Sequence, residues 1–160
     1  MQGMSIEGLT SSWENAFSTV REGEYTLMGA TFKSPLSYGE INAELLYLQF
    51  YVVDGKLFDL HVRPEVRAAW LDHWKSAAIS EIPNYSDEEL YEKRVAKYHE
   101  AASRAIQMGK PEEVSSRMGM VFSEFVGEAD LQLAMTVASL IHRMNMEIMK
   151  MVGANKADFH

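Results

Sequence analysis

The side chains of this sequence that are best suited to chemistry are histidines, and none of them lies in a recognised catalytic or metal-binding motif. They are His61, His73, His99, His142 and His160. The Glu-x-x-His pairs that hold two metal ions inside a helical bundle are absent, as is the His-Glu-x-x-His motif of zinc enzymes. The nearest approximation, His61 followed by Glu65, has a proline between its members. We therefore predict no metal site and no cofactor.

Nucleophilic and phosphoryl-transfer chemistry also lack a sequence signature. The chain contains no cysteine, which removes thiol nucleophiles, thiolate ligands and disulfides. It contains no Gly-x-Ser-x-Gly motif, no phosphate-binding loop and no dinucleotide-binding glycine pattern. We assign no catalytic residue, and the sequence favours a protein that is not an enzyme.

Two polar residues of the last apolar segment are candidates for ligand binding. His142 and Asn145 lie in the segment from Leu131 to Val152, which is otherwise rich in large apolar side chains. A buried polar group without a hydrogen-bond partner costs about 1–3 kcal/mol, so each must find one. One interpretation is a hydrogen bond to a neighbouring helix. The other is an internal ligand site, to which Tyr98, His99 or Glu124 could contribute.

Tryptophan and methionine side chains supply candidates for partner binding. Trp70 and Trp74 lie one helical turn apart and are either core residues or anchors for a partner. Seven of the eleven methionines fall between Met118 and Met151. Those at 144, 146, 149 and 151 cannot share one face of a helix, because each residue turns the helix by about 100°. We expect either burial or self-association there, and we name Met144 and Met151 as partner-binding residues.

Charge and hydropathy limit the partners. The net charge is −8, and such a field repels the phosphates of nucleic acid. The segment from Leu131 to Val152 carries too many polar residues to span a membrane, and the first residues have neither the basic nor the apolar part of a secretory signal. We expect no nucleic acid and no membrane as partner. Together with the absence of cysteine, these features favour a soluble cytoplasmic protein.

Apolar residues recur at intervals of three and four residues through most of the chain, and this spacing is typical of amphipathic helices. Capping residues, prolines and glycines limit the predicted segments. Helices are predicted over residues 6–20, 64–79, 86–108, 111–126 and 130–152. Residues 24–37 read as an extended connector, and residues after Gly153 are expected to fray.

Residues 38–62 permit two structures. Ser37 and Glu40 form a capping box, the reciprocal hydrogen bonding that starts a helix, and this helix would end before Gly55. Alternatively, Asp54-Gly55 is a dipeptide suited to a type I′ turn, which would join a β-hairpin over residues 46–62. We favour the helix, because the neighbouring segments are helical.

These patterns predict a mainly α protein, with residues 1–160 forming one domain of five or six helices around a central C-terminal helix. The function expected from them is that of a small acidic module for protein interaction or regulation, such as a binder, an inhibitor or an immunity-type protein. Its partner would be another protein or a second copy of the chain, as a homo-oligomer. The alternative is a small-molecule-binding protein or an unfamiliar enzyme with a polar pocket inside the bundle.

Overall fold

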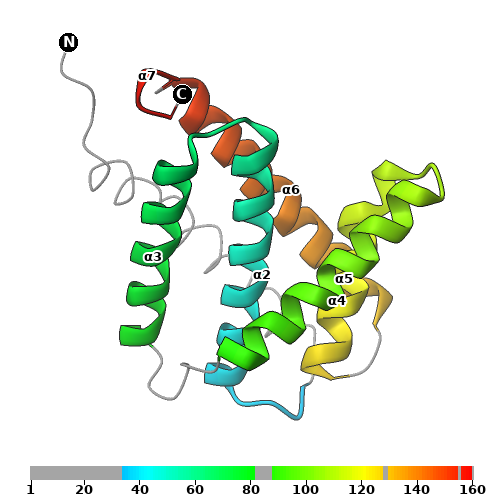
Figure 1. The fold of residues 1–160 in the computed structure, drawn as a ribbon. Coiled ribbons are helices and arrows are strands. Elements are labelled where there is room, and N and C mark those ends of the chain that lie inside the picture. Colours follow the sequence, from blue (N-terminus) through cyan, green and yellow to red (C-terminus); the bar gives the residue numbers. More distant parts are fainter. Residues whose placement is uncertain (1–33, 82–87, 128–129, 155, 160) are drawn as a thin grey trace.

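The structure, a computed structural model, describes residues 34–81, 88–127, 130–154 and 156–159, and every element among them is helical. The helices are α2 (Tyr38–Asp59), α3 (Pro64–Glu81), α4 (Glu88–Gln107), the 3-10 helix η1 (Pro111–Glu113), α5 (Val114–Val126), α6 (Leu131–Ala154) and α7 (Lys156–Phe159). Figure 1 shows α2 beside α3, with α4 and α5 extending to the other side and α6 crossing behind α2. The helix predicted over residues 6–20 lies outside the described residues.

The segment with two predicted structures is one continuous helix. The capping box is present: the Ser37 backbone N–H donates to Glu40 Oε2 (2.7 Å), and the Glu40 backbone N–H donates to Ser37 Oγ (3.3 Å). The helix continues through Gly55 to Asp59, so residues 46–59 form no hairpin and the helix does not end before Gly55. A glycine inside a helix costs about 1 kcal/mol relative to alanine. Burial of Val53 and Leu57 on either side of Gly55 offsets this cost.

The central helix is α2, so the prediction of a central C-terminal helix was wrong. All side chains from Glu44 to Phe50 are buried, as expected of a helix enclosed by others. Helices α3, α4, α5 and α6 all contact α2. Helix α6 instead buries one face, and four of its large apolar side chains, Leu131, Met135, Met146 and Met149, are exposed. Apolar content alone did not distinguish these two arrangements.

Helices α5 and α6 pack most closely at Gly119. A Cβ atom at this position would overlap the backbone carbonyl of Ala134. Ser123, one turn further along α5, is buried, and its hydroxyl accepts a hydrogen bond from the Asp130 backbone N–H (3.2 Å). The small side chains of α5 therefore let the backbones of the two helices approach, and this fixes the position of α6.

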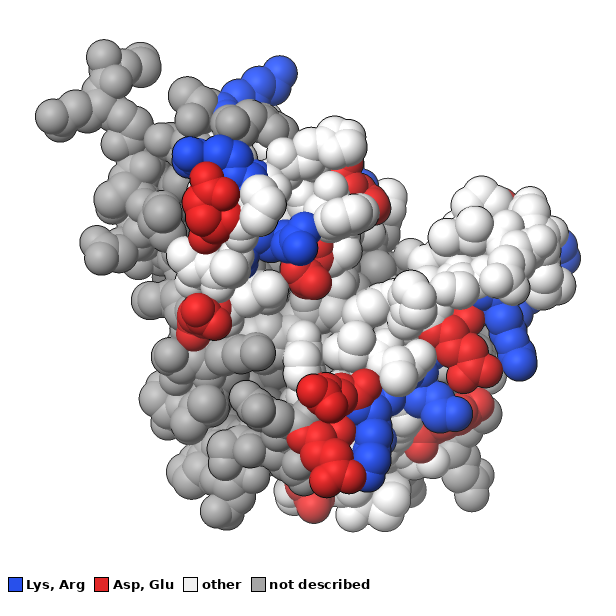
Figure 2. All heavy atoms as spheres, in the orientation of Figure 1, with Lys and Arg blue, Asp and Glu red and all other residues white. Residues whose placement is uncertain are grey.

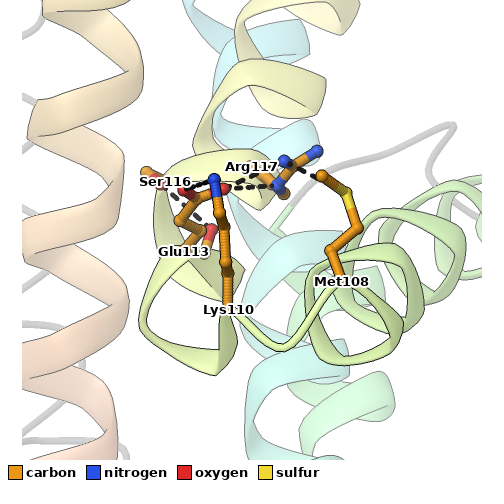
Figure 3. A network of polar contacts seen from close by, with 5 residues as sticks. All are labelled: Met108, Lys110, Glu113, Ser116 and Arg117. Atoms are coloured by element: carbon orange, nitrogen blue, oxygen red, sulfur yellow. Dashed lines mark hydrogen bonds and ion pairs between the residues drawn. The ribbon is translucent and has the colours of Figure 1, made fainter.

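The turn from α4 to α5 is held by Glu113 (Figure 3). Its carboxylate lies 2.9 Å from the Arg117 guanidinium and 3.4 Å from Lys110 Nζ. The hydrogen bond from Arg117 and the charge of Lys110 hold the pKa of Glu113 below its usual range. Gly109 has a φ of 69°, the left-handed conformation in which glycine commonly ends helices. The turn therefore sets the angle between α4 and α5.

The C-terminus packs against the turn between α2 and α3. Phe159 of α7 is buried in the core, and its carbonyl accepts a hydrogen bond from the Arg63 backbone N–H (2.9 Å). The prediction that residues after Gly153 fray was therefore wrong for Lys156–Phe159. The sequence pattern did not predict this contact with the core, because the contact depends on a single aromatic residue.

Candidate binding cleft

An open cleft of about 510 Å³ lies between α2 and α4, with further walls from α5 and α6 and from Arg67 of α3. Figure 2 shows uncharged side chains between the charged residues of α2 and α3 and those of α4. The volume lies within the usual range for ligand sites. The size and position of the cleft make it the candidate functional site.

Most of the cleft lining is aliphatic or aromatic. The aliphatic residues are Val52, Val95, Ala102, Ile106, Val114, Met118 and Ile141. Two large apolar side chains of the lining are unusually accessible: Phe58 at the end of α2 is 65 % exposed, and Ile106 at the end of α4 is 63 % exposed. Binding of a ligand or partner that covers these two side chains would be favourable, because it would remove apolar surface from water.

The charged groups of the cleft balance one another. Asp54 Oδ1 lies 3.1 Å from Arg67 Nε, and the Arg67 guanidinium lies over the Phe58 ring, 5.3 Å from its centroid. Lys56 and Asp59 add one charge of each sign. The lining therefore carries no net charge, which favours an uncharged group in the cleft.

Two tyrosines connect the cleft to the core, and their ionisation is suppressed. Burial, followed by the negative charge of Asp54, raises the pKa of Tyr91 to about 12. Burial and the charge of Asp59 raise the pKa of Tyr51. Both phenols are therefore neutral at physiological pH, and neither has the lowered pKa expected of a tyrosine that acts as a nucleophile or base.

Four further polar side chains complete the lining, and their geometry does not form a catalytic set. They are His99, Ser103, Ser115 and Asn145. Ser103 Oγ lies 3.4 Å from His99 Nε2, which is longer than a typical hydrogen bond between a nucleophile and its base. Within the described residues, no group of three or more His, Asp or Glu side chains is placed to hold a metal ion. The cleft can offer hydrogen bonds and apolar contact.

A buried ion pair supports the wall formed by α2 and α4. Arg94 Nη2 and Nε lie 2.7 Å and 2.9 Å from the two carboxylate oxygens of Glu44. The Arg94 guanidinium also lies 3.9 Å from the centroid of the Phe125 ring. Tyr98, which is fully buried, stacks on Tyr51 of the cleft with 5.8 Å between ring centroids. These contacts join α2, α4 and α5 and fix the side chains behind the cleft.

The residues predicted to bind a ligand are separated by the fold. Asn145 lines the cleft, whereas His142 is exposed on α6 and is not part of the lining. His99 also lines the cleft. Tyr98 lies in the core behind it, and Glu124 is exposed on α5. Of these predicted residues, only Asn145 and His99 line the cleft.

The residues predicted to bind a partner lie mostly inside the molecule. Trp70 and Met144 are buried in the core, and Met151 is half-buried against it. The side chain of Trp74 is outside what the structure describes. The exposed methionines of α6 are instead Met135, Met146 and Met149. The sequence contained no signal for Phe58 and Ile106, because their exposure depends on how α2 and α4 diverge.

Among the described residues, no helix combines the length and apolar composition required to cross a membrane. No family model matches the sequence, and no curated protein or solved structure shows significant similarity to it.

Proposed function

We propose that the protein is an interaction module that binds an apolar segment of a protein partner in the cleft between α2 and α4. The observation that carries this proposal is the exposure of Phe58 and Ile106, which come from different helices and line one cleft. Grooves between helices commonly receive the apolar face of an amphipathic segment. Large exposed apolar side chains in such a groove are typical anchors of an interface.

The charges of the molecule suggest the chemistry of the bound segment. The side chains that enter the cleft would be uncharged, because Asp54, Asp59, Lys56 and Arg67 balance one another. The whole chain carries a net charge of −8, so basic residues next to the apolar ones would speed association. The preferred partner segment is therefore apolar on one face and basic beside it.

Peptide selection on the full chain tests this function. Peptides from a random displayed library are selected on the protein, and their affinities are measured by fluorescence anisotropy. Phe58→Ala with Ile106→Glu is expected to weaken binding at least about tenfold, which corresponds to about 1.4 kcal/mol. Both side chains are mostly exposed, so circular dichroism should show an unchanged fold.

Leu131→Ala is the matched control, because Leu131 is an exposed apolar residue of α6 that lies outside the cleft. It should bind the selected peptides like the wild type. Peptides that bind the cleft variant and the wild type equally well would contradict the proposal.

A small uncharged molecule is the second candidate ligand. The observation that favours it is the presence of hydrogen-bonding side chains, including His99, Ser103 and Asn145, in a mainly apolar lining. Thermal-shift screening with a metabolite library separates the two candidates, since a ligand that binds only the folded state raises the melting temperature. A stabilising compound whose effect disappears in Phe58→Ala with Ile106→Glu would favour the small molecule.

A further inference from the structure

The sulfur atom of Met108 lies beside a guanidinium at the turn from α4 to α5 (Figure 3). Met108 directly follows α4, and Arg117 Nη2 donates a hydrogen bond to its Sδ atom at 3.6 Å. The same guanidinium contacts Glu113 Oε2 through Nε (3.0 Å) and Nη2 (2.9 Å). Because each terminal nitrogen of arginine carries two hydrogens, Nη2 can donate to the carboxylate and to the sulfur together. Arg117 therefore links the end of α4 to the beginning of α5.

The sulfur of Met108 is a weak hydrogen-bond acceptor but an accessible one. A thioether accepts hydrogen bonds poorly, so the contact with Arg117 contributes little in the reduced chain. Met108 is 56 % exposed, whereas Met118 and Met144 are buried. Oxidants in solution reach exposed sulfur atoms first, and the chain has no cysteine that would compete for them. Met108 is therefore both open to an oxidant and held next to a charged donor.

We propose that Met108 is a site of reversible oxidation by peroxide, and that Arg117 binds the resulting sulfoxide and fastens the turn between α4 and α5. In this reaction the sulfur lone pair attacks one oxygen of hydrogen peroxide, an S–O bond forms and the O–O bond breaks. The second oxygen leaves as hydroxide and takes the proton of the transferred hydroxyl, so the products are methionine sulfoxide and water. Sulfur loses two electrons, and the peroxide gains them. Methionine sulfoxide reductases restore the thioether.

Oxidation changes the acceptor that Arg117 meets. The sulfoxide oxygen is bonded directly to Sδ, which lies 3.6 Å from Arg117 Nη2. Rotation of the exposed side chain therefore brings this oxygen to about 2.7–2.9 Å from the nitrogen, the usual distance for a charged donor. Such a hydrogen bond is roughly twice as strong as one between neutral groups. The contact with Glu113 remains, because it uses other hydrogens of the guanidinium.

The exposed methionines of α6 provide an internal comparison. Met135 is 57 %, Met146 46 % and Met149 51 % exposed. Within the described part of the chain, no residue donates a hydrogen bond to their sulfur atoms. They undergo the same oxidation without a guanidinium that binds the product. Met108 does not line the cleft, so this inference does not rest on the proposed function.

Treatment of the full chain with hydrogen peroxide tests the proposal. Peptide mass spectrometry follows the oxidation of each methionine, and the melting temperature is measured before and after treatment. Because the other methionines are common to both chains, the shift in melting temperature is compared between the wild type and Met108→Leu. We expect the shift of the wild type to be more positive by at least about 2 °C. Met135→Leu is the matched control and should behave like the wild type.

The role of Arg117 has its own control. In chains that also carry Arg117→Gln, the difference in shift between Met108 and Met108→Leu should vanish. A difference that persists without Arg117, equal shifts in the wild type and Met108→Leu, or oxidation of Met108 no faster than that of buried Met144 would each overturn the proposal.

Met108→Gln gives a second test without peroxide, because its side-chain carbonyl oxygen stands in for the sulfoxide oxygen. Glutamine and leucine have similar helix propensities, so Met108→Leu is again the reference. With Arg117 present, Met108→Gln should melt at least about 2 °C above Met108→Leu. In chains with Arg117→Gln the two should melt at the same temperature. Equal melting temperatures in the presence of Arg117 would contradict the binding of the sulfoxide by this residue.

Discussion

At the scale of single residues, the ion pair between Glu44 and Arg94 is the polar contact with the largest expected effect on stability. Its side chains are 9 % and 21 % exposed, and the guanidinium contacts both carboxylate oxygens. Removal of one partner from a buried pair leaves the other charge without compensation and typically costs about 3–5 kcal/mol. Glu44→Gln should therefore lower the free energy of unfolding by about 3 kcal/mol, as measured by urea denaturation.

A surface pair provides the control for this prediction. Lys93 Nζ lies 2.8 Å from Glu89 Oε1, but both side chains are mostly exposed. Pairs of this kind contribute about 0–1 kcal/mol. Glu89→Gln should therefore have little effect, and a loss in Glu44→Gln no larger than the loss in Glu89→Gln would show that the buried pair does not stabilise the fold.

Because the pKa of Tyr91 is raised in the folded chain, we predict that the fold loses stability at alkaline pH. The pKa of Tyr91 is about 12 in the folded chain, against about 10 in the unfolded chain. Between these values the folded state binds more protons than the unfolded state, so the free energy of unfolding falls as pH rises. The stabilisation is complete below about pH 10 and is lost by about pH 12.

Urea denaturation at about pH 9 and about pH 11.5 measures this loss. Tyr91→Phe cannot ionise and should lose less stability than the wild type over the same interval. Lysines titrate equally in both proteins and cancel in the comparison. Identical pH dependence in the two proteins would contradict the assigned pKa.

At the scale of helices, substitution of two glycines by alanine is expected to have opposite effects on stability. Gly119→Ala would push α5 away from the backbone of Ala134, and such overpacking costs about 1–3 kcal/mol. Gly55 is exposed inside α2 with no neighbour in reach of a Cβ atom. Gly55→Ala should therefore stabilise the chain by up to about 1 kcal/mol through helix propensity. Thermal unfolding of both variants gives the signs, and destabilisation by Gly55→Ala would favour a turn at this position.

Several helix ends could be predicted from sequence because local chemistry determines them, although the end of α2 at Asp59 could not. Ser37 starts α2 by capping, Pro64 begins α3, and Gly109 follows the end of α4. The central position of α2 could not be predicted in this way. Both α2 and α6 are rich in apolar residues, and burial on one side or on all sides depends on which helices pack against them. The wrong prediction that the residues after Gly153 fray has the same cause, since Phe159 is held in place by tertiary contact alone.

The candidate site was less predictable than the helices. Sequence reasoning selected Asn145 and named His99, which both line the cleft. It also joined His142 to Asn145, because residues three apart on a helix lie only about 60° from one another. The packing of α6 leaves Asn145 at the edge of the cleft and His142 exposed outside it. Phe58 and Ile106 could not be selected, because apolar residues on helices are usually buried. A site made by the divergence of two helices requires their positions in space.

At the scale of the whole molecule, α2 connects all parts of the described fold. Helix α3 contacts α2 on one side, while α4, α5 and α6 form a second group that also packs against it. The large buried side chains of α2 belong to the same core as those of α5 and α6. Loss of the centre of α2 should therefore weaken both groups together.

Leu48→Ala tests whether the chain unfolds as one unit. Leu48 is fully buried in α2, and its truncation should cost about 2–5 kcal/mol. Unfolding in urea is followed by circular dichroism, which reports helix content, and by tryptophan fluorescence. If the fold is cooperative, the two signals will change at the same urea concentration in each protein, and this midpoint will be lower in the variant than in the wild type. Trp70 of α3 lies in the core and reports on the side opposite α4. Two separate midpoints in either protein would show that α3 and the α4–α6 group are independent units, because a shared core would force them to unfold together.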